Sequence, residues 1–197
     1  MALGDYRLCN VCHVKPALRD RLTCNVHTGQ MPHVRSPGAF TPAPEREPTW
    51  DQTWLECAHV MAKRSRCSRA QVGAVVVAED QTVISMSYNG PPRDFPTTQG
   101  DCSEWCPRSQ GTDDPSPTYD DCPSVHAEAN AIARADFSRM KNSTVYVSTS
   151  CCKGCAKLLA NSGVRRVVFQ SEAGRDYRNP QATIDFLREC GIEVSEV

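Results

Sequence analysis

The side chains with the clearest chemical potential are a histidine, a glutamate and two cysteines in the second half of the chain. His126 and Glu128 form a His-x-Glu pair, and Cys152 and Cys155 form a Cys-x-x-Cys pair further along. One imidazole and two thiolates supply three ligands for a tetrahedral zinc ion and leave the fourth position open, as in catalytic zinc sites. Glu128 is not needed as a ligand, so it can take a proton from water and pass it on.

This combination is the signature of zinc-dependent nucleobase deaminases. Cys152 and Cys155 stand at the predicted start of a helix, whose dipole favours their thiolate forms. The usual signature has Pro before the first cysteine, whereas this chain has Cys151, a second thiol that could replace Cys152 as the ligand. The alternative interpretation is a structural zinc site or a set of buried cysteines, with the His-x-Glu pair arising by chance.

Hydrophobic periodicity predicts the elements that position these residues. A helix follows Thr49 as its N-cap and runs to Met61, and two short β-branched runs predict a hairpin. The later helices and strands alternate, which indicates an α/β domain with a largely mixed sheet. The predicted strands are 71–78, 82–88, 143–148, 164–170 and 192–197, and the later helices are 125–135, 152–161 and 180–190.

The composition changes along the chain. Residues 1–29 hold two ligand pairs whose spacing predicts a small zinc knuckle, Cys9, Cys12, Cys24 and His27, with His13 and His33 as competing ligands. The proline-rich residues 30–48 predict an extended linker. Residues 49–197 form the predicted deaminase domain. Its segment 89–123 is rich in Gly, Pro, Ser and Asp, and a loop of this length needs something to order it.

Composition also restricts the class of protein. The 197 residues are 40% hydrophobic and 23% charged, with a net charge of −1, as in globular proteins. Near-neutral charge argues against a nucleic-acid binder, because such proteins bind phosphates through Lys and Arg. No apolar run predicts a membrane span, and no export signal is recognised. With 12 cysteines we therefore expect metal binding before disulfides, in the cytoplasm, or the host cytoplasm if the protein is viral.

Four segments together resemble the deoxycytidylate (dCMP) deaminase family, and the resemblance covers residues 49–197. They are Arg64–Ala74, Ser87–Pro92, Val125–Ile132 and Cys155–Leu159. The resemblance implies a three-layer α-β-α, cytidine-deaminase-like fold with a mixed five-stranded sheet. It also implies zinc-dependent hydrolysis of dCMP to dUMP and ammonia, which supplies dUMP for thymidylate synthesis. Water activated at the zinc would attack C4 of the pyrimidine, and Glu128 would protonate N3 and then the leaving amine.

The resemblance also implies which residues bind the substrate. Asn89 takes the family position beside the deoxyribose, and the backbone of Val72, Gly73, Ala74 and Ala127 lines the base pocket. Arg69, Gln71 and Tyr177 are expected at the sugar and phosphate end, where a nucleotide monophosphate brings about two negative charges. Alternatively, Arg69 is a solvated loop residue and Tyr177 has a packing role.

Some members of the family hold a second, structural zinc, and the resemblance extends to its ligands. The matching thiols are Cys67, Cys102 and Cys122, with Cys106 as the natural fourth ligand. A closed site would order the long loop; the alternative is a set of free thiols. Cys57, Cys151 and Cys190 have no predicted metal role. The family commonly forms hexamers regulated by dCTP and dTTP, so we expect a homo-oligomer and these effectors, although Arg93 and Asp94 stand where the effector loop often has Gly.

Two other functions are compatible with the residues. One is deamination of another cytosine or adenine substrate, as a nucleoside or as a base in nucleic acid, although no basic, aromatic-rich strip accompanies the motif. The other is a non-catalytic zinc-binding protein on the same scaffold. The intact set of Glu128 and three ligands favours an enzyme.

Overall fold

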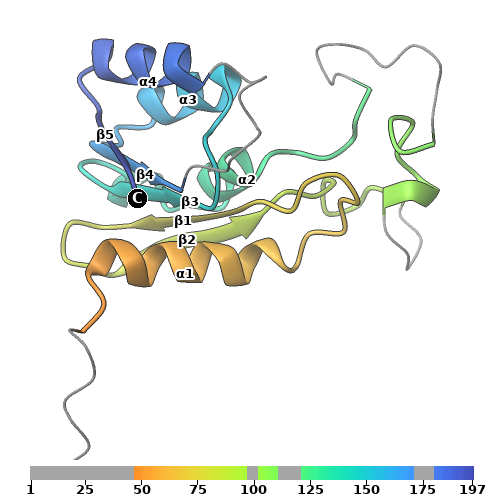
Figure 1. Cartoon of the computed structure of the whole chain (residues 1–197), viewed down its shortest axis with the longest axis horizontal. Coiled ribbons are helices and arrows are strands. Elements are labelled where there is room, and N and C mark those ends of the chain that lie inside the picture. Colours follow the sequence, from red (N-terminus) through yellow and green to blue (C-terminus); the bar gives the residue numbers. More distant parts are fainter. Residues whose placement is uncertain (1–46, 97–101, 111–120, 171–179) are drawn as a thin grey trace, which may run out of the picture. The chain divides into compact units, whose positions relative to one another are not determined.

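A mixed five-stranded sheet forms the centre of the molecule (Figure 1). The computed structural model describes residues 47–96, 102–110, 121–170 and 180–197. The strands have the order β2-β1-β3-β4-β5. Their bounds are β1 Gly73–Val77, β2 Val83–Tyr88, β3 Thr144–Val147, β4 Arg166–Phe169 and β5 Glu193–Glu196. β1 pairs antiparallel with β2 and β3, whereas β4 pairs parallel with β3 and β5, which confirms the predicted fold class.

Helices cover both faces of this sheet. α1 (Trp50–Ala62) lies on one face, and α2 (Ala127–Ala133), α3 (Lys153–Asn161) and α4 (Pro180–Glu189) lie on the other (Figure 1). Two short 3₁₀ turns, η1 (Cys102–Glu104) and η2 (Phe137–Arg139), interrupt the connections. All residues of β1 are buried, because a strand between two helical layers has no solvent-facing side.

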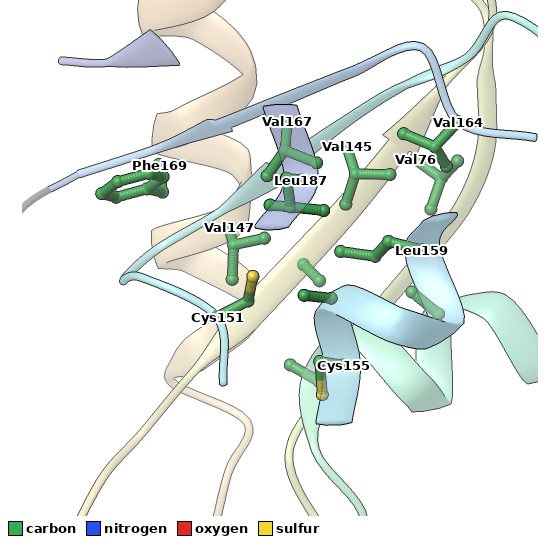
Figure 2. Packing of buried hydrophobic residues seen from close by; sticks show 14 of the residues in the cluster. Val76, Val145, Val147, Cys151, Cys155, Leu159, Val164, Val167, Phe169 and Leu187 are labelled. Carbon is green, nitrogen blue, oxygen red and sulfur yellow. The ribbon is translucent and has the colours of Figure 1, made fainter. Parts of the chain in front are cut away.

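Each face of the sheet has its own hydrophobic cluster. The cluster under α1 contains Leu55, Ala58, Val75, Val77, Tyr146 and Val168. The larger cluster, on the opposite face, contains Val76, Val145, Val147 and Val167 with Leu159 of α3 and Leu187 of α4 (Figure 2). Val75 and Val76 belong to different clusters because successive side chains of a strand point to opposite faces.

β1 begins at a close approach to α1. A Cβ atom on Gly73 would lie 1.9 Å from the carbonyl oxygen of Ala58 and 2.6 Å from the amide nitrogen of Ala62. Glycine is therefore required here unless α1 moves. The start of α1 is fixed by a capping box, in which Thr49 and Gln52 each accept a hydrogen bond from the other's backbone N–H.

Every predicted helix and strand of the deaminase domain is present, with ends shifted by a few residues. The helix predicted over 125–135 begins only at Ala127, because His126 has extended backbone angles of φ −64° and ψ 154°. Among the described residues, no helix is long and apolar enough to cross a membrane. The predicted zinc knuckle at 1–29 and most of the predicted linker lie outside the described residues.

Candidate active site

Three metal-binding side chains meet at the N-terminal ends of α2 and α3. His126 is the N-cap residue of α2, and Cys152 is the N-cap residue of α3. Cys155 lies in the first turn of α3 and is buried. The two helices share the larger hydrophobic cluster on one face of the sheet, so ligands that are distant in the sequence are brought together by the packing of these helices.

The separations of the ligand atoms suit a tetrahedral zinc ion. His126 Nδ1 lies 3.4 Å from the Sγ atom of Cys152 and 3.4 Å from that of Cys155. Usual Zn–N and Zn–S bonds at a tetrahedral angle require about 3.6 Å between nitrogen and sulfur. Among the described residues, these three form the group of metal-binding side chains whose ligand atoms all lie within 4.8 Å of one another. The residues present therefore fit the predicted catalytic zinc.

The two cysteines of this group have strongly coupled thiols. Hydrogen bonding from Cys155, assisted by His126, lowers the pKa of Cys152 to about 3. The same hydrogen bond raises the pKa of Cys155, because the proton is held between two sulfur atoms. One thiolate is therefore present before a metal binds, and metal binding releases the remaining proton.

Cys151 does not belong to this group. It is 5% exposed within the larger hydrophobic cluster, where Figure 2 shows it close to Val147. Burial raises the pKa of its thiol, which disfavours the thiolate that a metal requires. The geometry thus selects Cys152 as the ligand and gives Cys151 a packing role.

Glu128 lies beside the ligands in the first turn of α2. It is 3% exposed, and this burial raises the pKa of its carboxyl group above the ordinary value, although the charge of His126 opposes the shift. The carboxyl group also forms a hydrogen bond with Cys155. A carboxyl group that is easily protonated, next to a metal site, is suited to moving protons.

A cavity of about 180 Å³ gives access to this group. Its lining includes His126, Glu128 and Cys152 together with Val72, Asn89 and Ala127. The predicted residues Gly73 and Ala74 lie in β1, outside this lining. Of the residues predicted at the phosphate end, Arg69 lines the cavity, Gln71 donates through Nε2 to the carbonyl oxygen of Ser65 at 2.8 Å, and Tyr177 lies outside the described residues.

Two buried asparagines join segments around the site, and of these Asn89 lines this cavity whereas Asn130 lines a second one. Asn89 Oδ1 accepts a hydrogen bond from the N–H of Val72 at 2.8 Å, and its Nδ2 donates to the carbonyl oxygen of Ala70 at 2.9 Å. Asn130 Nδ2 donates to the carbonyl oxygens of Tyr88 and Val125 at 3.1 and 3.3 Å. The sequence reasoning missed Asn130, although an asparagine on the inner face of a helix is a signal for such a buried bond.

Cys67, Cys102, Cys106 and Cys122 line the same cavity. Cys106 Sγ lies 3.7 Å from Cys122 Sγ, and Cys102 Sγ lies 3.1 Å from Ser109 Oγ. Burial acts to raise the pKa of Cys102, but hydrogen bonds from Ser109 and Ser68 lower it overall; burial raises the pKa of Cys122. Among the described residues, these four do not form a group with all sulfur atoms within 4.8 Å.

Several polar residues of the cavity were not predicted from the sequence. Arg108, Ser109, Ser124 and Thr149 all contribute to its lining. Arg108 has a side chain that is 7% exposed and pairs with Asp121 at 3.6 Å. Residues 105–110 carry no periodic pattern. The only signal in the sequence for a role of Arg108 was its position two residues after the predicted ligand Cys106. The N-terminal ligands Cys9, Cys12, Cys24 and His27 lie outside the described residues.

Residues 48–171 match the model of the cytidine and deoxycytidylate deaminase zinc-binding region. A deoxycytidylate deaminase of Mycobacterium phage D29 is 40% identical over 131 residues, which are 64% of this chain and 98% of the phage protein. A deoxycytidylate deaminase of Saccharomyces cerevisiae is 33% identical over 155 residues, which are 78% of this chain but only 46% of the longer yeast protein.

Solved structures give the same picture of the fold. The dCMP deaminase of the cyanophage S-TIM5, in complex with dCMP and dUMP, superimposes with a TM-score of 0.56 at 25% sequence identity. The match covers 78% of this chain and 100% of the cyanophage chain. The cyanophage protein and this chain therefore share the arrangement of sheet and helices over almost the whole described region.

Proposed function

This chain belongs to the cytidine and deoxycytidylate deaminase family, and we propose that it hydrolyses dCMP to dUMP and ammonia. The observation that carries the proposal is the buried Glu128 beside the group His126, Cys152 and Cys155, at a cavity that Glu128 itself lines. A carboxyl group and an incomplete tetrahedral ligand set in one cavity can activate water and move its protons. The product would supply dUMP for thymidylate synthesis.

The catalytic zinc would be held by His126, Cys152 and Cys155. When bound, zinc supplies a Lewis acid that lowers the pKa of water in its open position and so provides a nucleophile at neutral pH. The two thiolates would offset the charge of the ion, so the attraction for an anionic substrate must come from other groups of the cavity.

Glu128 would carry the protons of the reaction. Hydrolysis adds the oxygen of water to C4 and breaks the C4–N4 bond, so one proton must reach N3 and another must reach the leaving amine. Burial raises the pKa of Glu128, which makes it a good acceptor of a proton from water and a holder of that proton until N3 or the amine takes it. The carboxyl group lies on α2, whose packing against the sheet fixes its position.

The residues predicted from the resemblance would bind the nucleotide, and of these Val72, Ala127, Asn89 and Arg69 line the cavity. We assign the base to the backbone of Val72, Gly73, Ala74 and Ala127. We assign the deoxyribose to Asn89, whose amide is held in place by its bonds to residues 70 and 72. Arg69, Gln71 and Tyr177 are assigned to the sugar and phosphate end.

A second, structural zinc at Cys67, Cys102, Cys106 and Cys122 is part of the proposal. The 3.7 Å between Cys106 Sγ and Cys122 Sγ is close to the roughly 3.8 Å expected between two thiolates on one tetrahedral zinc ion. It is far longer than a disulfide bond. The lowered pKa of Cys102 favours the thiolate form. A further zinc at Cys9, Cys12, Cys24 and His27 would order the N-terminal segment as a knuckle joined by the linker 30–48.

Nucleotide effectors are supported by a second cavity of about 270 Å³. Four arginines line it, Arg64, Arg66, Arg93 and Arg134, together with Tyr88, Phe95 and Trp105. Arginine guanidinium groups pair with phosphates and aromatic rings stack on bases, so dCTP and dTTP are suitable ligands. We further propose a cytoplasmic homo-oligomer, with a hexamer as the family arrangement.

The function is tested by assaying the purified, zinc-loaded protein on dCMP, dCTP, deoxycytidine and an RNA oligonucleotide. We expect the highest kcat/KM for dCMP. Faster turnover of another substrate would replace dCMP with that substrate, and no deamination of any of them by the zinc-bound protein would indicate a non-catalytic scaffold.

A matched pair of variants then tests the role of Glu128. Glu128→Gln should lower kcat by at least about a hundredfold with the zinc content unchanged, whereas Glu189→Gln on the exposed end of α4 should leave both unchanged. Loss of zinc from Glu128→Gln would mean that this carboxylate is a ligand.

A further inference from the structure

We propose that Arg108 binds the 5′-phosphate of the substrate and makes this chain prefer nucleotides to nucleosides, with Asp121 as the residue that positions it. The inference rests on the proposed deamination of dCMP and deepens it, since it names a specificity residue that lies in the cysteine-containing insertion. Arg108 stands between two predicted zinc ligands, Cys106 and Cys122.

The charge of the substrate requires cations in the cavity. A nucleotide monophosphate carries close to two negative charges at neutral pH. Among the described residues that line the cavity, Arg69 and Arg108 are the arginines and no lysine is present, while Glu128 and the cysteines contribute only neutral or negative groups. Among the described lining residues, these two arginines are therefore the permanently charged cations that a phosphate can reach.

Burial distinguishes Arg108 from Arg69. The side chain of Arg108 is 7% exposed, whereas Arg69 is an exposed residue at the cavity edge. A buried guanidinium interacts with an anion through a low effective dielectric, and solvent screens an exposed one. Arg108 should therefore contribute more to phosphate binding than Arg69 does.

The pair with Asp121 does not exclude a phosphate. Asp121 Oδ1 lies 3.6 Å from Arg108 Nη1, so the carboxylate faces one nitrogen of the guanidinium. Arginine has five N–H donors in a planar fork, which can serve a carboxylate on one side and two phosphate oxygens on another. Asp121 thereby offsets the cost of removing the Arg108 guanidinium from water, and it orients the plane of that group.

Hydrogen bonds attach the Arg108 segment to the loop before β1. The N–H of Cys102 donates to the carbonyl oxygen of Arg66 at 2.9 Å, and the N–H of Ser68 lies 3.2 Å from Cys102 Sγ. Arg69 Nη1 also donates to the carbonyl oxygen of Arg108 at 3.5 Å. These contacts hold two sequence-distant segments together at the cavity, so Arg108 is supported from both sides.

A structural role for Arg108 is the competing explanation, because the residue also lies among cysteines that could hold zinc. The two roles predict different results. If Arg108 binds the phosphate, its loss lowers kcat/KM for dCMP more than for deoxycytidine. If Arg108 supports a zinc site, its loss lowers the zinc content and reduces kcat/KM for both substrates alike.

The test compares kcat/KM for dCMP and for deoxycytidine in the zinc-loaded wild type, Arg108→Gln and the control Arg188→Gln, which changes an exposed arginine of α4. We expect Arg108→Gln to lower the ratio of the two kcat/KM values by roughly ten- to a hundredfold, as for a lost hydrogen-bonded charge pair. The change should be mainly in KM, with zinc per chain unchanged, and Arg188→Gln should keep the wild-type ratio. An unchanged ratio in Arg108→Gln, or a fall accompanied by loss of zinc, overturns the proposal.

Two further measurements keep the outcome decisive. If Arg108→Gln does not fold, Arg108→Lys replaces it. Lysine keeps the positive charge but lacks the planar set of guanidinium donors, so the ratio of kcat/KM for dCMP to that for deoxycytidine should fall several-fold. An unchanged ratio overturns the proposal. If the wild type deaminates neither substrate, the proposed function fails, and calorimetric binding of dUMP against deoxyuridine then decides the role of Arg108. The wild type should bind dUMP more tightly, and equal loss of both ligands in the variant would refute phosphate binding.

Discussion

Two groups of cysteines lie at or beside the same cavity but differ in what holds them. Cys152 and Cys155 lie at the N-terminal end of α3, which is packed into the larger hydrophobic cluster. Cys102 and Cys106 lie in and just after the short turn η1 and are held by hydroxyl groups and backbone hydrogen bonds. The first group already has the separations of a tetrahedral site, whereas the second does not bring all its sulfur atoms within 4.8 Å.

This difference teaches how a metal site acquires its geometry. A helix packed on a sheet fixes the direction of a side chain at its first turn, so the ligand arrangement follows from the core. A loop without a hydrophobic cluster has no such support, and the metal itself must supply the free energy that orders it. We therefore expect the first site to be robust and the second to depend on its zinc.

The largest expected effect is the loss of a ligand from the first group. Cys152→Ser should lower kcat/KM for dCMP by at least about a thousandfold and remove one zinc per chain, because the activation of water depends on that metal. Steady-state kinetics and elemental analysis measure the two quantities. Cys190→Ser changes an exposed cysteine and should alter neither. If Cys151→Ser removed the zinc instead, the assignment of the first ligand would be wrong.

The packing that positions Cys152 and Cys155 can be disturbed by a substitution on the face of the sheet that α1 covers. Gly73→Ala places a Cβ atom against backbone atoms of α1, so the helix must shift and the free energy of unfolding should fall by about 2–3 kcal/mol. Urea unfolding measures this. Gly90→Ala is the control, since a Cβ there meets a side-chain atom of Tyr88 at 3.5 Å, an ordinary contact. Equal stability of the two variants would show that α1 is not fixed at Gly73.

Loss of a ligand from the second group should have a smaller effect on catalysis. Cys106→Ser should remove one zinc per chain and lower kcat/KM for dCMP by roughly tenfold, a cost typical of residues that support a site without touching the reacting atoms. The catalytic zinc should remain, so the protein keeps measurable turnover. A loss of activity as large as that of Cys152→Ser would contradict the separation of the two groups.

The smallest expected effect concerns the ion pair between Asp51 of α1 and Arg166 of β4. Arg166 Nη1 and Nη2 each donate to Asp51 at 2.8 Å, and the hydroxyl of Tyr146 donates to the same carboxylate at 2.9 Å. Hydrogen bonding from Arg166 lowers the pKa of Asp51, so the pair stabilises the fold above the unfolded-state pKa of about 4 and is lost as the pH falls through the lower folded-state pKa.

The test of this pair is the pH dependence of stability. Asp51→Asn should lower the free energy of unfolding by about 1 kcal/mol at pH 7, and the difference from the wild type should shrink below pH 4. Glu56→Gln changes an exposed carboxylate on the same helix and is the control. A difference that stays constant down to pH 2 would mean that Asp51 does not act through its charge.

Much of the fold could be predicted because its signals are local. The β-branched run that contains Val75–Val77 predicts a strand, and Thr49 as an N-cap before apolar residues at helical spacing predicts the start of α1. The catalytic group was also predictable, since His126, Cys152 and Cys155 belong to motifs with fixed spacing. Spacing alone could not show whether Cys151 or Cys152 is the candidate ligand, because this depends on which thiol is buried in the core.

The contributions of other residues depend on contacts between distant segments. Gln71 was expected near the substrate, but its amide donates to the carbonyl oxygen of Ser65. Asn130 was not singled out, and it joins α2 to the loop after β2. Arg108 carries no motif, and hydrogen bonds between residues 66–69 and 102–108 join its segment to the loop before β1.

The sequence by itself predicted an α/β fold with a mixed sheet, a group of three candidate zinc ligands and a glutamate beside them, because each prediction depends on periodicity or on short spacing. The tertiary structure alone decided which thiol the core buries, which backbone groups Asn89 and Asn130 bind, and that Arg108 lines the cavity. Those properties arise from burial and from hydrogen bonds between segments far apart in the chain, and neither is a local property of the sequence.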